Sequence, residues 1–154
     1  MKRILLIVTG VYLLAIPAAT HAKEPTMNLK KITPVLLADD VQAIIDFWAE
    51  FGLSAPMTVP DDDGVMFAIV TNGAVELMYQ TKKSARADNA DAVKGIDRAM
   101  IYIEVNSFDD IIDAAKRYEV VKPEHMTDYG AREIYIRDPA GNVVGFAEQG
   151  AAGE

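Results

Sequence analysis

The stretch AREIYIRDPAGNVVGFAE, residues 131–148, decides the fold, because two runs of alternating apolar residues face each other across a turn. Ile134 and Ile136 alternate with polar residues before the turn, and apolar residues resume after it. This pattern predicts a β-hairpin. Pro139 fixes φ and Gly141 tolerates positive φ, so the turn has a physical mechanism as well as a composition.

An earlier stretch, GVMFAIVTNGAVELMYQ, residues 64–80, has the same form with a tighter Asn72-Gly73 turn, which is the strongest short hairpin signal. The two halves of the chain align at a shift of 67 residues, which places Phe67 on Ile134. After the turns the shift grows to 69 residues, because the second turn is longer. Each half therefore reads β-α-β-β-β. Such a small unit leaves one sheet face bare, so two units must pair within a chain or between chains.

Residue composition and hydrophobic pattern along the sequence divide the chain into six predicted segments. They are a signal peptide (1–22), an N-terminal arm (23–29), a first βαβββ module (30–81), a linker (82–97), a second βαβββ module (98–149) and a tail (150–154). Lys2 and Arg3 precede an apolar run that is too short for a membrane span and ends at Pro17. We therefore expect the signal to be cleaved, the mature protein to be periplasmic or secreted, and the membrane to play no further part.

Charge narrows the classes of partner. The formal net charge is −8, and loss of Lys2 and Arg3 with the signal makes it −10. An acidic surface repels nucleic acid and anionic lipid and favours cationic or neutral partners, although acidity can also serve solubility alone. The chain has no Cys, so disulfides, thiolate nucleophiles and thiolate metal sites are excluded.

Alternation assigns the two faces of each predicted sheet. Helices are expected over 41–51, capped by Asp39 or Asp40, and from about 107 to Tyr118, whereas the linker lacks apolar periodicity. Phe67, Ile69, Val75, Leu77, Ile134, Ile136, Val144 and Phe146 are predicted on the helix side. The opposite face then collects Thr33, Val35, Met66, Ala68, Glu76, Met78, Gln80, Met100, Tyr102, Glu104, Glu133, Tyr135, Arg137, Gly145 and Ala147. The expected fold class is α+β, with curled mixed sheets, helices on the outer face, and a groove along the other face.

The repeat, together with ITPVLLADDVQAIIDFW followed by FGL and with REIYIRDPAGNVVGF, resembles the vicinal oxygen chelate superfamily. This group contains glyoxalase I, extradiol dioxygenases, fosfomycin-resistance enzymes and bleomycin-binding proteins, and the likeness covers nearly all of residues 30–148. The stretches PVLLADDVQAIIDFWAEFGLS and AREIYIRDPAGNVVGF look closest to the bleomycin-binding proteins. That resemblance implies a protein that sequesters a planar or cationic ligand and catalyses nothing.

The resemblance also implies four positions at which metal enzymes of the superfamily place their ligands. In this sequence they are occupied by Thr33, Glu76, Met100 and Gly145. Of these side chains, that of Glu76 alone can bind a hard or borderline divalent ion, since a thioether suits Cu(I) and glycine offers no ligand. We therefore expect neither a metal nor another cofactor.

Several candidate residues have more than one interpretation. Glu76 can be a general base, a counter-charge for a cationic ligand, or a strand carboxylate paired with arginine. His125, in a predicted loop, can shuttle protons but is more simply a bystander. Trp48 is expected in the core, and Asp61, Asp62 and Asp63 lack the ligand spacing of a calcium loop. Adaptable methionines and stacking tyrosines suit a ligand. The predicted contacts are Glu76, Met78, Met100, Tyr102, Glu104, Tyr129, Tyr135 and Arg137.

The sequence therefore predicts a metal-free homodimer that binds or sequesters a small organic molecule in a groove. The first alternative is a glyoxalase-like lyase or isomerase, or a dioxygenase-related enzyme, with Glu76 as its catalytic base. The second is a structural subunit whose groove is filled by a segment of a partner. Nucleic-acid binding has no basic patch to support it.

Overall fold

The computed structural model describes residues 30–150. The predicted signal peptide and N-terminal arm lie outside the described residues, as do residues 151–154 of the predicted tail. Contacts divide the chain into two units, Met1–Lys31 and Ile32–Glu154, and the fold and the site belong to the second. Within the described residues, no helix has both the length and the apolar character needed to cross a membrane.

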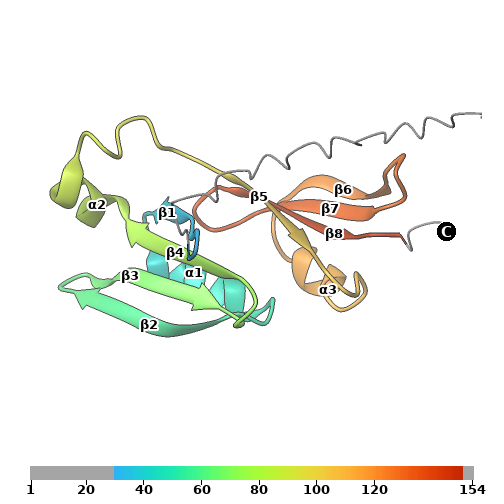
Figure 1. Ribbon diagram of the computed structural model, residues 1–154, viewed down its shortest axis with the longest axis horizontal. Coiled ribbons are helices and arrows are strands. Elements are labelled where there is room, and N and C mark those ends of the chain that lie inside the picture. Colours follow the sequence, from blue (N-terminus) through green and yellow to red (C-terminus); the bar gives the residue numbers. More distant parts are fainter. Residues whose placement is uncertain (1–29, 151–154) are drawn as a thin grey trace, which may run out of the picture. The chain divides into compact units, whose positions relative to one another are not determined.

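Two similar modules follow each other along the chain (Figure 1). The first contains β1 (Val35–Ala38), α1 (Val41–Ala49), β2 (Ser54–Asp61), β3 (Gly64–Thr71) and β4 (Glu76–Thr81). The helix α2 (Lys82–Asn89) follows, and the second module contains β5 (Met100–Glu104), α3 (Ile112–Ala115), β6 (Val120–Met126), β7 (Arg132–Arg137) and β8 (Val143–Glu148). The predicted α+β fold with two βαβββ modules is confirmed.

Each module folds into one four-stranded mixed sheet. The strand orders are β1-β4-β3-β2 and β5-β8-β7-β6. In each sheet the first and last strands of the module pair in parallel, and the other neighbours are antiparallel. The parallel pairs repeat at a shift of 67 residues, since Val35 lies opposite Met78 as Tyr102 lies opposite Gly145. The predicted growth of the shift to 69 is therefore wrong for these strands.

Helix α1 begins and ends where its residues dictate. The Asp40 carboxylate caps it by accepting a hydrogen bond from the amide of Ala43 at 3.1 Å. Gly52, at φ 80°, allows the chain to turn after the helix. The apolar stripe of α1 buries Val41, Ile44, Phe47 and Trp48, as helical periodicity predicts.

The predicted faces are confirmed in the second sheet and wrong in β3. Ile134, Ile136, Val144 and Phe146 are buried on the helix side. In β3, however, the buried residues are Ala68 and Val70, whereas Phe67 and Ile69 are only partly buried and point the other way. Ala68 lies opposite the fully buried Tyr79, which fixes this phase. The run VMFAIV is apolar on both faces, so alternation alone could not set it.

Four other local predictions differ from the structure. The linker contains α2, which is capped by the Thr81 hydroxyl accepting from the amide of Ser84 at 3.2 Å. The second predicted helix is reduced to α3, with four residues. His125 lies on strand β6 and not in a loop. Val75, predicted on the helix side, is half exposed in the turn before β4.

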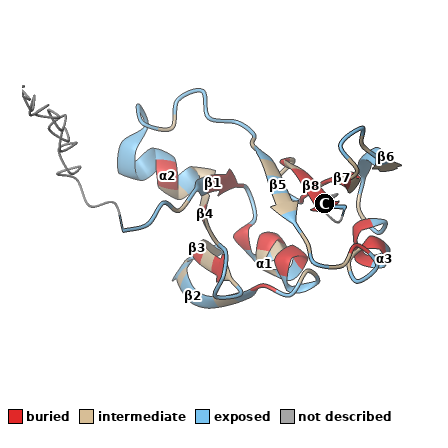
Figure 2. Cartoon of the chain, turned by 45° about the vertical axis from the view of Figure 1, so that its right-hand side comes forward, coloured by how far each residue is buried: buried red, intermediate tan, exposed pale blue. Residues whose placement is uncertain are grey.

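One core joins the two modules. The ring of Phe47 packs edge-on against Tyr118 with centroids 4.8 Å apart, and Phe51 stacks on Phe146 at 4.6 Å. Trp48 is fully buried, as predicted, and its indole N–H donates to the Tyr79 hydroxyl at 3.1 Å. Figure 2 shows the buried residues gathered along the inner stripe of α1 and on β7 and β8. Because this core takes the helix side of both sheets, their other faces are open for function.

Candidate ligand-binding site

A buried carboxylate lies on the open face of the second sheet. Glu133, on β7, is 2% exposed. Its Oε1 accepts hydrogen bonds from the hydroxyls of Tyr102 at 2.9 Å and Tyr129 at 2.6 Å, and its Oε2 accepts from that of Tyr135 at 2.9 Å. These three tyrosines come from β5, the β6–β7 turn and β7. We call Glu133, Tyr102, Tyr129 and Tyr135 the tyrosine cluster.

The tyrosine cluster holds a negative charge at neutral pH. Burial alone would raise the pKa of Glu133, but the hydrogen bonds from the three tyrosines and the neighbouring His125 outweigh it and lower that pKa below its usual value. Burial and the bond to Glu133 raise the pKa of Tyr135 to about 12, and the same causes raise that of Tyr102. The three phenols are therefore neutral donors around an anion.

The aromatic rings of the tyrosine cluster reach solvent above that anion. Tyr129 is 68% exposed and Tyr102 is 46% exposed. Tyr135 instead packs its ring against Gly145, the residue opposite it on β8. A Cβ atom at Gly145 would stand 2.5 Å from Cε1 of Tyr135, so glycine is required there for the ring to occupy this place.

His125 completes the surroundings of the carboxylate. It lies opposite Glu133 on the neighbouring strand, and its ring is nearly parallel to that of Tyr135 at 6.2 Å between centroids. Its Nδ1 is 2.9 Å from the carbonyl oxygen of Pro123, and its Nε2 is 3.5 Å from Oε2 of Glu133. On the same strand, the Lys122 ammonium lies 5.8 Å from the Tyr135 ring centroid.

The structure separates the predicted contacts into groups. It brings Tyr102, Tyr129 and Tyr135 together. It places Glu76, Tyr102 and Glu104 along a second feature, a cavity of about 700 Å³ that is largely apolar. The aromatic and aliphatic side chains that line this cavity include Trp48, Phe51, Leu53, Leu77, Ile101 and Phe146.

The remaining predicted contacts do not belong to the tyrosine cluster. Met78 belongs to the first sheet, where it lies between Val35 and Ile69. Met100, 65% exposed, begins β5. Arg137 is committed elsewhere, since it donates to the carboxylate of Glu119 and to the backbone carbonyl of Gly141, each at 3.1 Å.

Sequence reasoning placed Glu133 on the open face but did not choose it as a contact. The signal was present, because alternation puts Glu133 on the same face as Tyr135 and Tyr129 precedes it by four residues. His125 was set aside as a bystander in a loop, yet it lies opposite Glu133. Neither pairing is visible without the register of β6 against β7.

The four residues that the resemblance assigns to the superfamily's metal positions have other roles in this chain, and the observed shift of 67 makes Met78, not Glu76, the equivalent of Gly145. The Thr33 hydroxyl donates to Oε1 of Glu76 at 3.1 Å. Met100 offers a thioether, and Gly145 has no side chain and lies beneath Tyr135. This donor set does not fit a hard or borderline divalent ion. Within residues 30–150, no group of three or more His, Asp or Glu side chains is placed to hold a metal ion.

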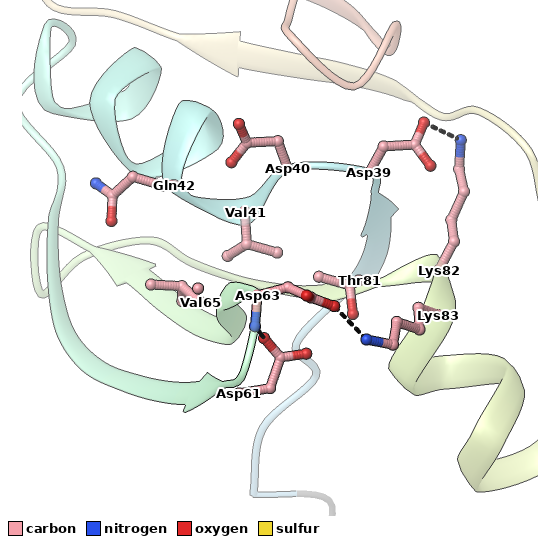
Figure 3. A pocket seen from close by; sticks show the side chains of 11 residues that line it. Asp39, Asp40, Val41, Gln42, Asp61, Asp63, Val65, Thr81, Lys82 and Lys83 are labelled. Atoms are coloured by element: carbon pink, nitrogen blue, oxygen red, sulfur yellow. Dashed lines mark hydrogen bonds and ion pairs between the residues drawn. The ribbon is translucent and has the colours of Figure 1, made fainter.

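A polar pocket of about 460 Å³ at the start of α1 is the other acidic site (Figure 3). Its carboxylates already have structural partners. Asp40 caps α1, and Asp61 accepts from the amide of Asp63 at 2.9 Å. Asp39 pairs with Lys82 at 2.9 Å, and Asp63 pairs with Lys83. The pocket is therefore a set of caps, turns and ion pairs.

Comparison with known proteins agrees with this fold. Residues 30–146 match the family model described as Glyoxalase/Bleomycin resistance protein/Dioxygenase superfamily. No curated protein matches the chain significantly. A solved glyoxalase/bleomycin resistance protein/dioxygenase from Nocardioides is 21% identical with a TM-score of 0.62, over 84% of this chain and 90% of that one.

Two further solved structures represent an enzyme and a binding protein. A lactoylglutathione lyase from Agrobacterium tumefaciens is 21% identical with a TM-score of 0.59, over 79% of this chain and 95% of that one. A bleomycin-binding protein in complex with bleomycin is 13% identical with a TM-score of 0.53, over 79% of this chain and 100% of that one. At such identities the likeness shows a shared fold, and function must be argued from the site.

Proposed function

Because the chain belongs to the Glyoxalase/Bleomycin resistance protein/Dioxygenase superfamily, we propose that it binds and sequesters a small organic ligand at the tyrosine cluster. One observation carries the proposal: an ionised, buried carboxylate is held by three phenols whose rings line an open sheet face. Buried carboxylates that serve only the fold are commonly paired with Lys or Arg, whereas among the described ion pairs the partner of Glu133 is an imidazole.

The proposed ligand is an organic cation with a planar or apolar body. A cation placed over electron-rich rings gains from cation–π attraction, and these phenols donate their protons to a carboxylate, which leaves their rings richer in electrons. The formal net charge of −8 draws such a ligand toward the protein. A structural neighbour was solved in complex with bleomycin, which supports ligand binding as one function carried by this fold.

Catalysis through a metal does not fit this proposal. The reason is the donor chemistry at the four residues that the resemblance assigns to metal positions, among which Glu76 is hydrogen-bonded to Thr33 and Gly145 is covered by Tyr135. The chain's own residues instead suit binding. Neutral phenols orient a fixed anion, and the exposed rings of Tyr102 and Tyr129 offer a surface on which a flat molecule can stack.

The test measures binding of benzyltrimethylammonium and of its neutral carbon isostere, neopentylbenzene, by calorimetry and thermal shift. We expect the cation to raise the melting temperature and the isostere to have little effect. The substitution Glu133→Gln keeps the shape and removes the charge, so it should weaken binding by about tenfold or more. Asp91→Asn, which removes an exposed charge in the linker, is the matched control. Equal effects of the two probes would contradict a site for cations.

A second candidate function rests on Glu76. Its hydrogen bond from Thr33 orients the carboxylate, it borders the 700 Å³ cavity, and one structural neighbour is a lactoylglutathione lyase. Glu76 would then act as the base of a lyase or isomerase. A methylglyoxal and glutathione assay, with and without added nickel or zinc, tests this candidate. Turnover that is lost in Glu76→Gln would favour the enzyme over the binding protein.

We also propose an exported homodimer, in which residues 1–22 direct export to the periplasm or the medium and a second copy covers exposed apolar side chains outside the tyrosine cluster. Ile32, Val35 and Met100 are largely exposed, and burial of such side chains favours association. N-terminal sequencing of the native protein tests cleavage of the signal. Light scattering of the purified protein tests the dimer.

A further inference from the structure

The hydrogen-bonding partners of His125 determine where its protons belong. Nδ1 lies 2.9 Å from the carbonyl oxygen of Pro123, and a carbonyl oxygen can only accept. Nδ1 must therefore carry a hydrogen and donate. In a neutral imidazole the other nitrogen, Nε2, is then a bare acceptor.

Nε2 meets a group with which a bare acceptor cannot bond. It is buried without a hydrogen-bond partner among the described residues, and it lies 3.5 Å from Oε2 of Glu133. Because Glu133 is ionised, its oxygens also only accept. Two acceptors thus face each other in a buried place. A proton on Nε2 removes this conflict, since the imidazolium donates at both nitrogens and faces the carboxylate with a positive charge.

The other groups around His125 do not replace Glu133 in this role. The hydroxyl of Tyr135, whose ring lies along the imidazole, donates to Glu133, as do those of Tyr102 and Tyr129. On β6, Lys122 lies toward the ring of Tyr135. Glu124, next to His125, pairs with Arg132 at 2.8 Å and with Lys116 at 3.9 Å, and Arg132 also pairs with Asp109 at 2.7 Å. Among the described ion pairs, the carboxylate facing His125 is therefore Glu133.

We propose that a proton on His125 and the organic cation compete for the single negative charge of Glu133, so that the site exchanges one for the other. This inference rests on the function proposed above. The protonated imidazole neutralises Glu133 when the site is empty. When the cation binds, Nε2 releases its proton to solvent and Glu133 pairs with the ligand, which conserves charge. Binding is then weaker at acidic pH, and a ligand held in neutral surroundings is released in acidic ones.

Calorimetry of benzyltrimethylammonium binding tests the exchange directly. Titrations in phosphate and in Tris, whose ionisation enthalpies differ, report the number of protons released. We expect up to about one proton released near pH 7 and an affinity about tenfold lower at pH 5 than at pH 8. In His125→Asn, whose amide can still donate to Pro123, release should vanish and the affinity should become independent of pH over this range.

A second measurement needs no ligand. His21 is the chain's other histidine, so a His21→Gln background leaves one imidazole to follow by nuclear magnetic resonance. The imidazole should titrate at a lower pH in Glu133→Gln than in the parent, because the opposing charge has gone. Asp91→Asn serves as the control for net charge. Identical titrations of parent and Glu133→Gln would overturn the proposed charge pair.

The outcomes separate this inference from the proposed function. Binding of the cation that is independent of pH and releases no proton overturns the exchange and leaves the cation site intact. Absence of binding at every pH overturns both. Binding that weakens in acid equally in the parent and in His125→Asn overturns the role of His125, because another group would then carry the titration.

Discussion

The two modules place different chemistry on the same framework. One row across the first sheet contains Val35, Met78, Ile69 and Met57, and the corresponding row of the second contains Tyr102, Gly145, Tyr135 and Lys122. The next row contains Leu37, Gln80, Phe67 and Val59 in the first, and Glu104, Ala147, Glu133 and His125 in the second. The first sheet therefore offers a mainly apolar face, and the second offers a fixed charge.

This comparison teaches that the repeat preserves backbone pairing while the open faces diverge. Both parallel pairs keep the same register, and the helix sides of both sheets stay apolar because they share one core. The open faces carry no such constraint. An apolar row suits contact with another surface, and a row with a buried anion suits selection of a ligand.

The largest expected effect comes from adding a methyl group at Gly145 in the second sheet, where the position of the Tyr135 ring depends on the absence of a side chain. Gly145→Ala places a carbon 2.5 Å from the Tyr135 ring, so the ring must leave its place and its bond to Glu133 is lost. We expect a loss of about 1–3 kcal/mol in the free energy of unfolding, measured by urea titration. In a Tyr135→Ala background the same change should cost little. Equal costs in both backgrounds would show that the ring is not what forbids a side chain.

A smaller effect is expected from the charge itself, and it depends on pH. The pKa of Glu133 is lower in the folded state than its usual value, so its contribution to stability is present above the unfolded pKa and lost as pH falls through the folded one. Glu133→Gln cannot titrate. Between about pH 5 and pH 3 the parent should therefore lose about 1 kcal/mol more than this variant. Parallel losses in urea titrations of the two proteins would contradict a stabilising role for the ionised carboxylate.

The smallest effect is the difference in cost between the same substitution in the two hairpin turns. Gly73 and Gly141 have φ of 90° and 87°, which disfavour any residue with a Cβ. A Cβ at Gly73 meets no atom within 4 Å, whereas one at Gly141 stands 3.1 Å from Nε of Arg98. Gly73→Ala should cost about 1 kcal/mol, the strain of the backbone alone. Gly141→Ala should cost more, and thermal melts of both variants provide the comparison.

Much of the fold could be predicted from local pattern. Two hairpins with mechanistically clear turns, a capped helix and a repeat determine the βαβββ modules and the α+β class. The predictions that were wrong concern features that the local sequence pattern does not encode. The phase of β3 was ambiguous because the strand is apolar on both faces, and α2 lacks an apolar stripe because it buries little besides Ala85. The shift of 67 in the parallel pairs depends on pairing, which sequence spacing misjudged.

The candidate site was predicted in part. Three tyrosines chosen from the sequence meet in one cluster, because alternation places Tyr102 and Tyr135 on one face and Tyr129 lies four residues before Glu133. Glu133 and His125 were missed as site residues, since their importance arises from cross-strand contact. Arg137 was chosen for its face, yet it binds Glu119 and the turn. The partner of a charged side chain is set by which opposite charge lies nearest in the folded structure, and the sequence does not report that distance.

The packing of Tyr135 against Gly145 also couples the two positions to each other. A single substitution that introduced a carboxylate at residue 145 would meet the phenol ring already present there. Removing the ring first would deprive Glu133 of a hydrogen-bond donor. Each change is therefore expected to be harmful by itself, and the effects of the two changes should not be additive.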